Sequence, residues 1–178
     1  MDLIKKLHNI IEEGDLWDGE ILLKRNQFLK VAKSIDTNLY YVISGSIKIS
    51  VISENNEHII RFGYKNNFTA SLDSFISEKP SDFCIQAIKE TKLKFITKKT
   101  HTKLINHNTD NQLLWTSILE QMVVQQLERE RDLLMFTPKE RFEKVFQRSP
   151  HLFQEIPKKH IASYLRMTPE TLSRLEKS

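Results

Sequence analysis

One long helical segment constrains the fold of this chain more than any other feature. The stretch from Asn111 to Phe136 contains neither Gly nor Pro, and apolar residues recur through it at helical spacing. This pattern predicts a single helix of roughly 25 residues, nearly 40 Å long at about 1.5 Å per residue. One small domain cannot cover such a helix, and its apolar positions occupy more than one face. We therefore favour a homodimer through this helix over a core helix in a larger monomer, with the interface at Trp115, Ile118, Met122 and Gln125.

Composition places the chain among cytoplasmic proteins with room for one good-sized domain or two small ones. The 178 residues include a single cysteine, Cys84, which indicates a reducing compartment and excludes an iron–sulfur cluster built on several thiolates. The first 14 residues form an amphipathic helical pattern without a cleavage site. No stretch approaches the roughly 18 apolar residues of a membrane span, so no membrane partner is expected.

Residues 20–98 have the pattern of short strands. Alternation at Tyr41, Ile43, Ile47, Ile49 and Val51 leads through a polar turn into residues 58–64, which predicts a hairpin. Four further runs are expected to be strands, at residues 20–23, 27–32, 83–88 and 92–97. Short strands separated by polar turns are typical of an antiparallel sandwich or jelly roll. With the long helix, the fold class is α+β.

Prolines divide residues 137–178 into short helices. We expect helices over 138–148, over 157–165 and from 169 onward, with a turn near Pro150. Apolar residues fall on one face of the second of these, and Thr168 precedes Pro169 as the N-cap of the third. Two short helices joined by a tight turn predict a helix-turn-helix at residues 157–177.

The last helix carries a polar outer face that suits DNA. Its side chains at helical spacing are Glu170, Ser173, Arg174 and Lys177, which can bond base edges and phosphates. The alternative is an ordinary solvated face, stabilised by Glu170 and Arg174 as an i,i+4 pair. Charge favours DNA: residues 136–178 hold nine Lys and Arg against five Asp and Glu, whereas residues 1–135 hold eighteen of each.

The order of these parts resembles the Crp/Fnr family of bacterial transcription regulators along nearly the whole chain. The matching motifs are YYVISGSIKIS, with its turn at Gly45, and RMTPETLSRL. The resemblance implies a sensor-like jelly roll in residues 1–110, a dimerisation helix in 111–136 and a DNA-binding domain in 137–178. It also implies base contacts by Glu170 and Arg174, and further DNA contacts by Thr168, Thr171, Ser173 and Lys177.

Two departures from the family concern its DNA-binding half. Arg166 stands where many relatives have Gly, so a positive φ there would cost about 1 kcal/mol. The sequence ends three residues after Leu175, so the β-hairpin wing of many relatives is expected to be missing, with fewer phosphate contacts.

The resemblance also implies an effector pocket, and there the required residues are missing. Cyclic-nucleotide sites of this kind use Gly-Glu for the ribose and Arg-Ser or Arg-Thr for the phosphate. The matching positions are Ala70, Ser71, Ser81 and Asp82. No other register restores the pair, because no Glu lies between Glu57 and Glu78 and no Arg between Arg61 and Arg129. We expect no binding of cyclic AMP or cyclic GMP, and either a different small-molecule effector or none.

Other site chemistries find no support in the sequence. The six histidines show no metal-ligand spacing, the four glycines form no phosphate loop, and Cys84 lies in an apolar strand. We expect no enzyme, cofactor or metal. The sequence predicts a homodimeric regulator that binds double-stranded DNA at a palindromic site. The alternative is a dimeric ligand-sensing or protein-interaction module that has lost DNA binding.

Overall fold

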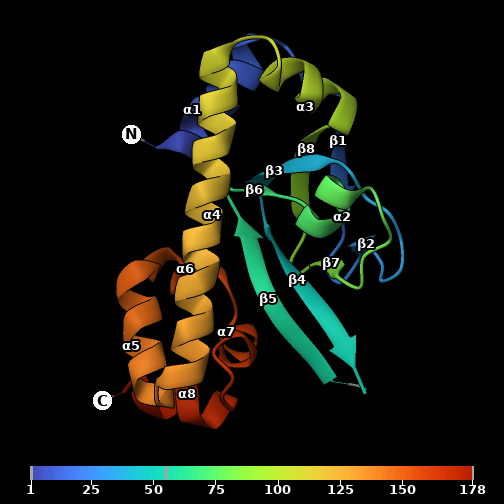
Figure 1. Ribbon diagram of the computed structural model, residues 1–178. Coiled ribbons are helices and arrows are strands. Elements are labelled where there is room, and N and C mark those ends of the chain that lie inside the picture. Colours follow the sequence, from blue (N-terminus) through green and yellow to red (C-terminus); the bar gives the residue numbers. More distant parts are fainter. Residues whose placement is uncertain (1, 55, 178) are drawn as a thin grey trace.

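A computed structural model describes residues 2–54 and 56–177, and it has the form of a β sandwich and a group of helices set along one long helix (Figure 1). In chain order the elements are α1 (Leu3–Glu13), β1 (Gly19–Leu23), β2 (Phe28–Lys30), β3 (Leu39–Ser44), β4 (Ser46–Ser53), β5 (Asn56–Tyr64), β6 (Phe68–Thr69), α2 (Leu72–Ser77), β7 (Cys84–Ala87), β8 (Thr91–Ile96), α3 (Lys98–Ile105), α4 (Thr109–Met135), α5 (Pro138–Arg148), α6 (Pro150–Glu155), α7 (Lys158–Tyr164) and α8 (Pro169–Leu175). The predicted α+β class is confirmed. The division into domains at residues 110 and 136 stays a prediction.

The β sandwich consists of two four-stranded sheets, in the orders β1-β8-β3-β6 and β2-β7-β4-β5. Neighbouring strands run antiparallel, as the short alternating runs predict. The space between the sheets is filled by apolar side chains from both, listed here by strand: Leu23, Tyr40, Val42, Ile47, Ile49, Ile85, Ala87 and Leu93. The jelly-roll core is therefore independent of the helices.

The turn at Gly45 changes which face of β3 points inward, so one detail of the predicted alternation is wrong. The run from Tyr41 to Val51 suggested one continuous face, but the chain passes from one sheet to the other between β3 and β4. Val42 is buried and Ile43 is only half-buried, so the inward face of β3 is the opposite of the one expected. Gly45 has φ +87, and a Cβ there would lie 2.3 Å from the carbonyl oxygen of Glu90. Only glycine fits this crossing without rearrangement.

Three helices join the β sandwich to the first half of α4. Leu7 and Ile11 of α1 are fully buried and pack with Ile96, Leu104 and Leu114 in one apolar cluster. The amphipathic pattern of the first residues is thereby confirmed as α1. The helices α2 and α3 were not predicted, because they are short segments of six and eight residues without a clear helical period.

The helix α4 confirms the long segment, but its apolar faces are used differently from the expected arrangement. Ile118 is only 4% exposed, and Trp115 and Met122 pack against the same cluster within the chain, whereas Gln125 is exposed. Three of the four residues expected at a dimer interface thus lie on the inner side. The outer side of α4 carries a second set of apolar residues that no other described part of the chain covers. These are Leu113, Val123, Val124, Leu127 and Leu134, which are between 55% and 78% exposed. Periodicity reveals both stripes but cannot tell which one α1 covers.

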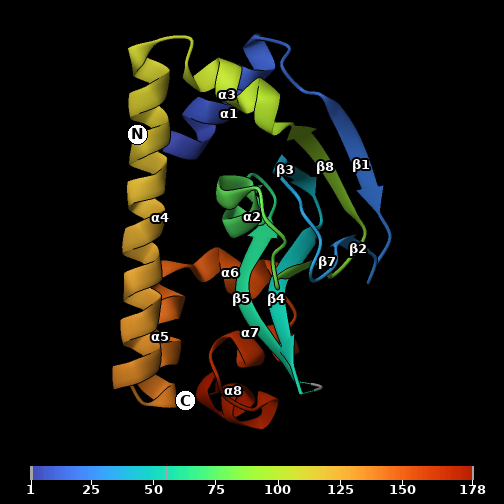
Figure 2. The same cartoon turned by 45° about the vertical axis from the view of Figure 1, so that its right-hand side comes forward.

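The C-terminal helices α5 to α8 pack beside the second half of α4 (Figures 1 and 2). The range predicted for α5 agrees with the structure, and Thr137 forms the capping box with Glu140. The expected turn near Pro150 is instead the short helix α6. None of the helices in the described part of the chain is both long and apolar enough to span a bilayer.

Candidate nucleic-acid interface and its attachment

The helices α7 and α8 form the expected helix-turn-helix. Ile161 and Ala162 of the first helix and Leu165 at its C-cap are buried, and the second helix is anchored through Leu172 at 0% exposure. The turn contains Arg166 with φ +55, which confirms the left-handed conformation expected at that position. Thr168 accepts a hydrogen bond from the Thr171 amide at 3.2 Å as the N-cap of α8, and Pro169 opens the helix. Local sequence signals therefore determine this motif.

The residues expected to contact DNA lie together on the outer side of α8. Thr168, Glu170, Arg174 and Lys177 are exposed, whereas Thr171 and Ser173 are half-buried at the edges of this face. The Glu170 carboxylate bonds its own backbone N–H and the Thr168 hydroxyl, and these bonds lower its pKa. The face thus presents an ionised carboxylate beside two cations, which can accept from and donate to base edges.

The helix-turn-helix is docked on the β sandwich. Ile59 and Phe62 of β5, together with Ile88, share one buried cluster with residues of α5 to α8. Tyr164 lies against Phe62, with ring centroids 5.4 Å apart. Lys89 and Glu155 form an ion pair of 3.0 Å across the same boundary. The position of α8 relative to the β sandwich is therefore held by a continuous apolar contact with polar contacts at its edge.

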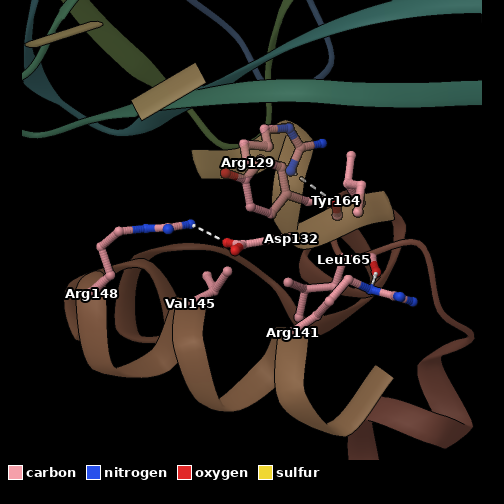
Figure 3. Close-up of a pocket in the computed structure, with 8 residues that line it drawn as sticks. Arg129, Asp132, Arg141, Val145, Arg148, Tyr164 and Leu165 are labelled. Atoms are coloured by element: carbon pink, nitrogen blue, oxygen red, sulfur yellow. Dashed lines mark hydrogen bonds and ion pairs between the residues drawn. The ribbon is translucent and has the colours of Figure 1, made fainter. Parts of the chain in front are cut away.

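Arg129 connects three elements at the centre of this docking contact (Figure 3). Its side chain leaves α4, is 9% exposed, and donates to the carbonyl oxygens of Ile59 on β5 at 3.1 Å and Tyr164 on α7 at 3.2 Å. The guanidinium also lies 3.8 Å from the centroid of the Tyr164 ring. A planar fork of donors suits such a site, because its N–H groups point in fixed directions toward the two oxygens.

Two further arginines fix α5 against its neighbours (Figure 3). Asp132 is 3% exposed, and its carboxylate pairs with Arg148 at 3.1 Å and with the neighbouring Arg131 at 3.5 Å, so the buried charge is compensated. Arg141 donates to the carbonyl oxygens of Leu165 at 2.9 Å and Arg166 at 3.2 Å, in the turn before α8. The space among these side chains is about 10 Å³, room for roughly one water molecule, so the cluster is an attachment and not a ligand pocket.

His160 lies at the edge of the docking contact. It stands on α7 near the ion pair between Lys48 of β4 and Glu57 of β5. Burial, followed by the charges of Lys48 and Lys159, lowers the pKa of His160 to about 4. The imidazole is therefore neutral at pH 7, and its protonation would add a cation beside those lysines.

The four residues matched to an effector pocket are brought together only in part. Ser71 and Ser81 are 1% and 2% exposed, and the Ser71 hydroxyl donates to that of Ser81 at 3.2 Å. Beside them Lys30, 4% exposed, donates to the Ser81 carbonyl oxygen at 3.2 Å and the Phe83 carbonyl oxygen at 2.7 Å. Ala70 packs on the α1–α4 cluster, and Asp82 is exposed and pairs with Lys33. The two serines thus bond each other.

Sequence reasoning missed the arginines of the docking contact. Arg129 and Asp132 break the apolar pattern of the long helix, which was the available signal, but the partners of Arg129 lie 35 and 70 residues away. Contacts at such separations are visible only after folding. Among residues 2–54 and 56–177, no three His, Cys, Asp or Glu side chains are grouped as a metal would require.

Comparison with known proteins identifies the fold. No protein-family model matches the chain, and no curated protein does. Among solved structures, FixK2 from Bradyrhizobium japonicum is 16% identical with a TM-score of 0.75, covering 89% of this chain and 82% of FixK2. The c-di-GMP-responsive global regulator CLP from Xanthomonas campestris is 15% identical with a TM-score of 0.68, covering 96% and 90%. The catabolite activator protein of Thermus thermophilus is 15% identical with a TM-score of 0.59, covering 97% and 81%.

These structures are regulators of the Crp/Fnr type, and their likeness extends over both the β sandwich and the C-terminal helices. The fold implied by the sequence motifs is therefore confirmed. At 14–16% identity the likeness concerns the fold, and the activity has to be argued from the residues of this chain.

Proposed function

We propose that this protein is a DNA-binding transcription regulator of the Crp/Fnr type. The observation that carries the proposal is the exposed outer face of α8, where Glu170, Arg174 and Lys177 lie on a helix that a buried Leu172 anchors from behind. A rigidly seated helix with an open polar face is what insertion into a major groove requires.

The chemistry of this face suits direct base reading. The Glu170 carboxylate can accept from cytosine N4, and the Arg174 guanidinium can donate to both O6 and N7 of guanine. Lys177 lies three residues beyond Arg174 and suits a phosphate, with Thr168, Thr171 and Ser173 supplying hydroxyls at the groove edges. Base contacts would then select the sequence, and phosphate contacts would supply affinity.

A homodimer formed through the outer face of α4 completes the proposal. Leu113, Leu127 and Leu134 are separated by multiples of seven residues, and Val123 and Val124 fall between them on the same side. All five are more than half exposed, which supports a coiled-coil contact with a second copy. Two copies related by a two-fold axis would present two α8 helices to a palindromic site.

The proposal includes a sensor that does not bind cyclic nucleotides. The hydroxyls of Ser71 and Ser81 bond each other, and the Lys30 ammonium is already engaged by backbone oxygens of the same region. No arginine of the chain lies between Arg61 and Arg129, so a bidentate phosphate ligand is missing from the matched segment. A calorimetric titration with cyclic AMP and cyclic GMP should give no micromolar binding; a saturable micromolar isotherm with either would overturn this part.

Fluorescence anisotropy across a salt series tests DNA binding directly. Labelled random duplex and a palindrome selected from a random pool are titrated with the full chain. We expect binding that weakens steeply with salt, and tighter binding to the palindrome. If neither duplex binds even at low ionic strength, the regulator proposal fails in favour of a dimeric sensing or interaction module.

A further inference from the structure

A second hollow is lined by residues of α2, α3 and the first half of α4. Its volume is about 360 Å³, within the usual range of small-molecule pockets, roughly 300–1,000 Å³. The walls are mainly apolar, formed by Phe75, Ile76, Ile105, Trp115 and Leu119. None of the residues matched to the effector pocket lines it. Size and lining suit an apolar body of a few carbon atoms.

Two polar groups on the lining bear on the chemistry of such a ligand. Lys98 donates to the carbonyl oxygen of Phe75, lies 4.3 Å from the centroid of its ring, and is 4.0 Å from the Glu78 carboxylate. An ammonium has three donors, so it can serve a further acceptor. His101 is 5% exposed, and its buried Nε2 has no hydrogen-bond partner among the described residues. A buried polar atom without a partner calls for a water or ligand atom.

The charge around the hollow favours an anion. The helix α3 carries Lys98, Lys99 and Lys103 and has no acidic residue. The carboxylate nearest to Lys98 is that of Glu78, whose side chain is 66% exposed and whose contact at 4.0 Å is long. A ligand carboxylate could take the place of Glu78 at the Lys98 ammonium without leaving a buried charge.

We infer that this hollow binds a small carboxylic acid with an apolar body. The carboxylate is held by Lys98, and the body lies between the rings of Phe75 and Trp115 and the aliphatic side chains around them. Trp115 and Leu119, which line the hollow, belong to α4. The site is separate from the serine pair of the jelly roll.

Titration with octanoate tests the inference, with octanol and octylamine as controls of equal length that are neutral or cationic. The protein is the full chain with Trp17→Phe, so that Trp115 is the sole tryptophan and its fluorescence reports on the hollow. Calorimetry on the unmodified chain gives a second measurement. We expect saturable binding of octanoate and binding at least tenfold weaker for both controls, since a charge-assisted bond is lost.

Two variants connect binding to the hollow. Lys98→Met keeps the apolar stem and removes the charge, and should weaken octanoate roughly tenfold or more while leaving octanol unchanged. Lys99→Met is the matched control, because Lys99 is exposed on the same helix and does not line the hollow, and it should have little effect. Thr102→Phe at the exposed rim should block both compounds by filling the space.

Equal binding of the three compounds, or octanoate binding that survives both Lys98→Met and Thr102→Phe, would overturn the inference. The absence of any octanoate binding would do the same. The titrations contain no DNA, so their outcome is independent of the proposed DNA-binding function, and either can fail without the other.

Discussion

The guanidinium of Arg129 on α4 lies 3.8 Å from the centroid of the Tyr164 ring on α7 and donates to the carbonyl oxygen of the same residue at 3.2 Å. A third contact to Ile59 of β5 places the long helix, the β sandwich and the helix-turn-helix within reach of one side chain. The orientation of α8 relative to the proposed dimer helix therefore depends on a buried polar contact as well as on apolar packing.

Replacing Arg129 tests this dependence. Arg129→Met leaves two backbone oxygens without their donor and removes the stacking on Tyr164, and should lower the free energy of unfolding by on the order of 3 kcal/mol. Arg129→Lys should lose less, because the charge over the ring remains. Gln126→Met at an exposed position of α4 is the control, with a change within about 0.5 kcal/mol, all measured by urea denaturation. Equal stability of Arg129→Met and the control would contradict the role.

Arg174 and Lys177 should differ in how they affect DNA binding. Arg174→Ala should weaken binding to the selected palindrome by about 1–3 kcal/mol and relax the preference at one base pair in each half-site. Lys177→Ala should weaken all sequences alike and reduce the salt slope by about one. Anisotropy on palindrome and random duplex distinguishes the two. A loss from Arg174→Ala that is the same on both duplexes would make Arg174 a phosphate contact.

Leu127 is 59% exposed at the middle of the outer face of α4 and should decide the oligomeric state. Leu127→Glu places a charge at the proposed coiled-coil contact and should shift the protein from dimer to monomer in sedimentation equilibrium. Leu22→Glu is the matched control, since Leu22 is 63% exposed on β1 and lies outside this face. If Leu127→Glu leaves the mass of a dimer unchanged, the outer face of α4 is not the interface.

Two histidines make the fold sensitive to acid. The pKa values of His101 and His160 are lowered to about 4, from 6.5, by burial first and then by Lys98 and Lys48 respectively. A pKa below the unfolded value means that the unfolded chain binds the proton more tightly. The contribution of the two neutral histidines to the free energy of unfolding is therefore complete above about pH 6.5. It falls as the pH drops toward about 4.

His101→Phe provides the corresponding measurement. His101 is 5% exposed between the rings of Phe75 and Trp115, so an aromatic replacement fits its surroundings. Between pH 7.5 and pH 5 the parent chain should lose on the order of 1–2 kcal/mol more unfolding free energy than the variant. Parallel losses in the two proteins would show that His101 does not carry this pH dependence.

Gly45 should tolerate no side chain. Gly45→Ala forces a Cβ to within 2.3 Å of the Glu90 carbonyl oxygen at a φ of +87, and should destabilise the jelly roll by several kcal/mol, about 3 or more. Ser44→Ala at the neighbouring exposed position is the control and should be nearly neutral. Thermal unfolding of both variants provides the comparison, and a melting temperature of Gly45→Ala close to the control would contradict the steric argument.

Sequence alone determined the features that depend on residues near one another in the chain. The range of α5, the cap at Thr168 and the length of α4 follow from spacing, capping and proline geometry over a few residues, whereas the left-handed turn at Arg166 was expected from the family resemblance. The polar face of α8 follows from the same local periodicity. These interactions are the same whatever the rest of the chain does.

Only the tertiary structure decided which surfaces face each other. The long helix has two apolar sides, and it is the packing of α1 that buries Ile118 and leaves Leu127 outside. Likewise Arg129 reaches oxygens 35 and 70 residues away, and the hollow beside Lys98 exists because α2 and α3 meet α4. Such contacts form between segments that are far apart in the chain. Whether each partner is buried depends on those distant segments, and the local periodicity of the sequence does not show where they lie.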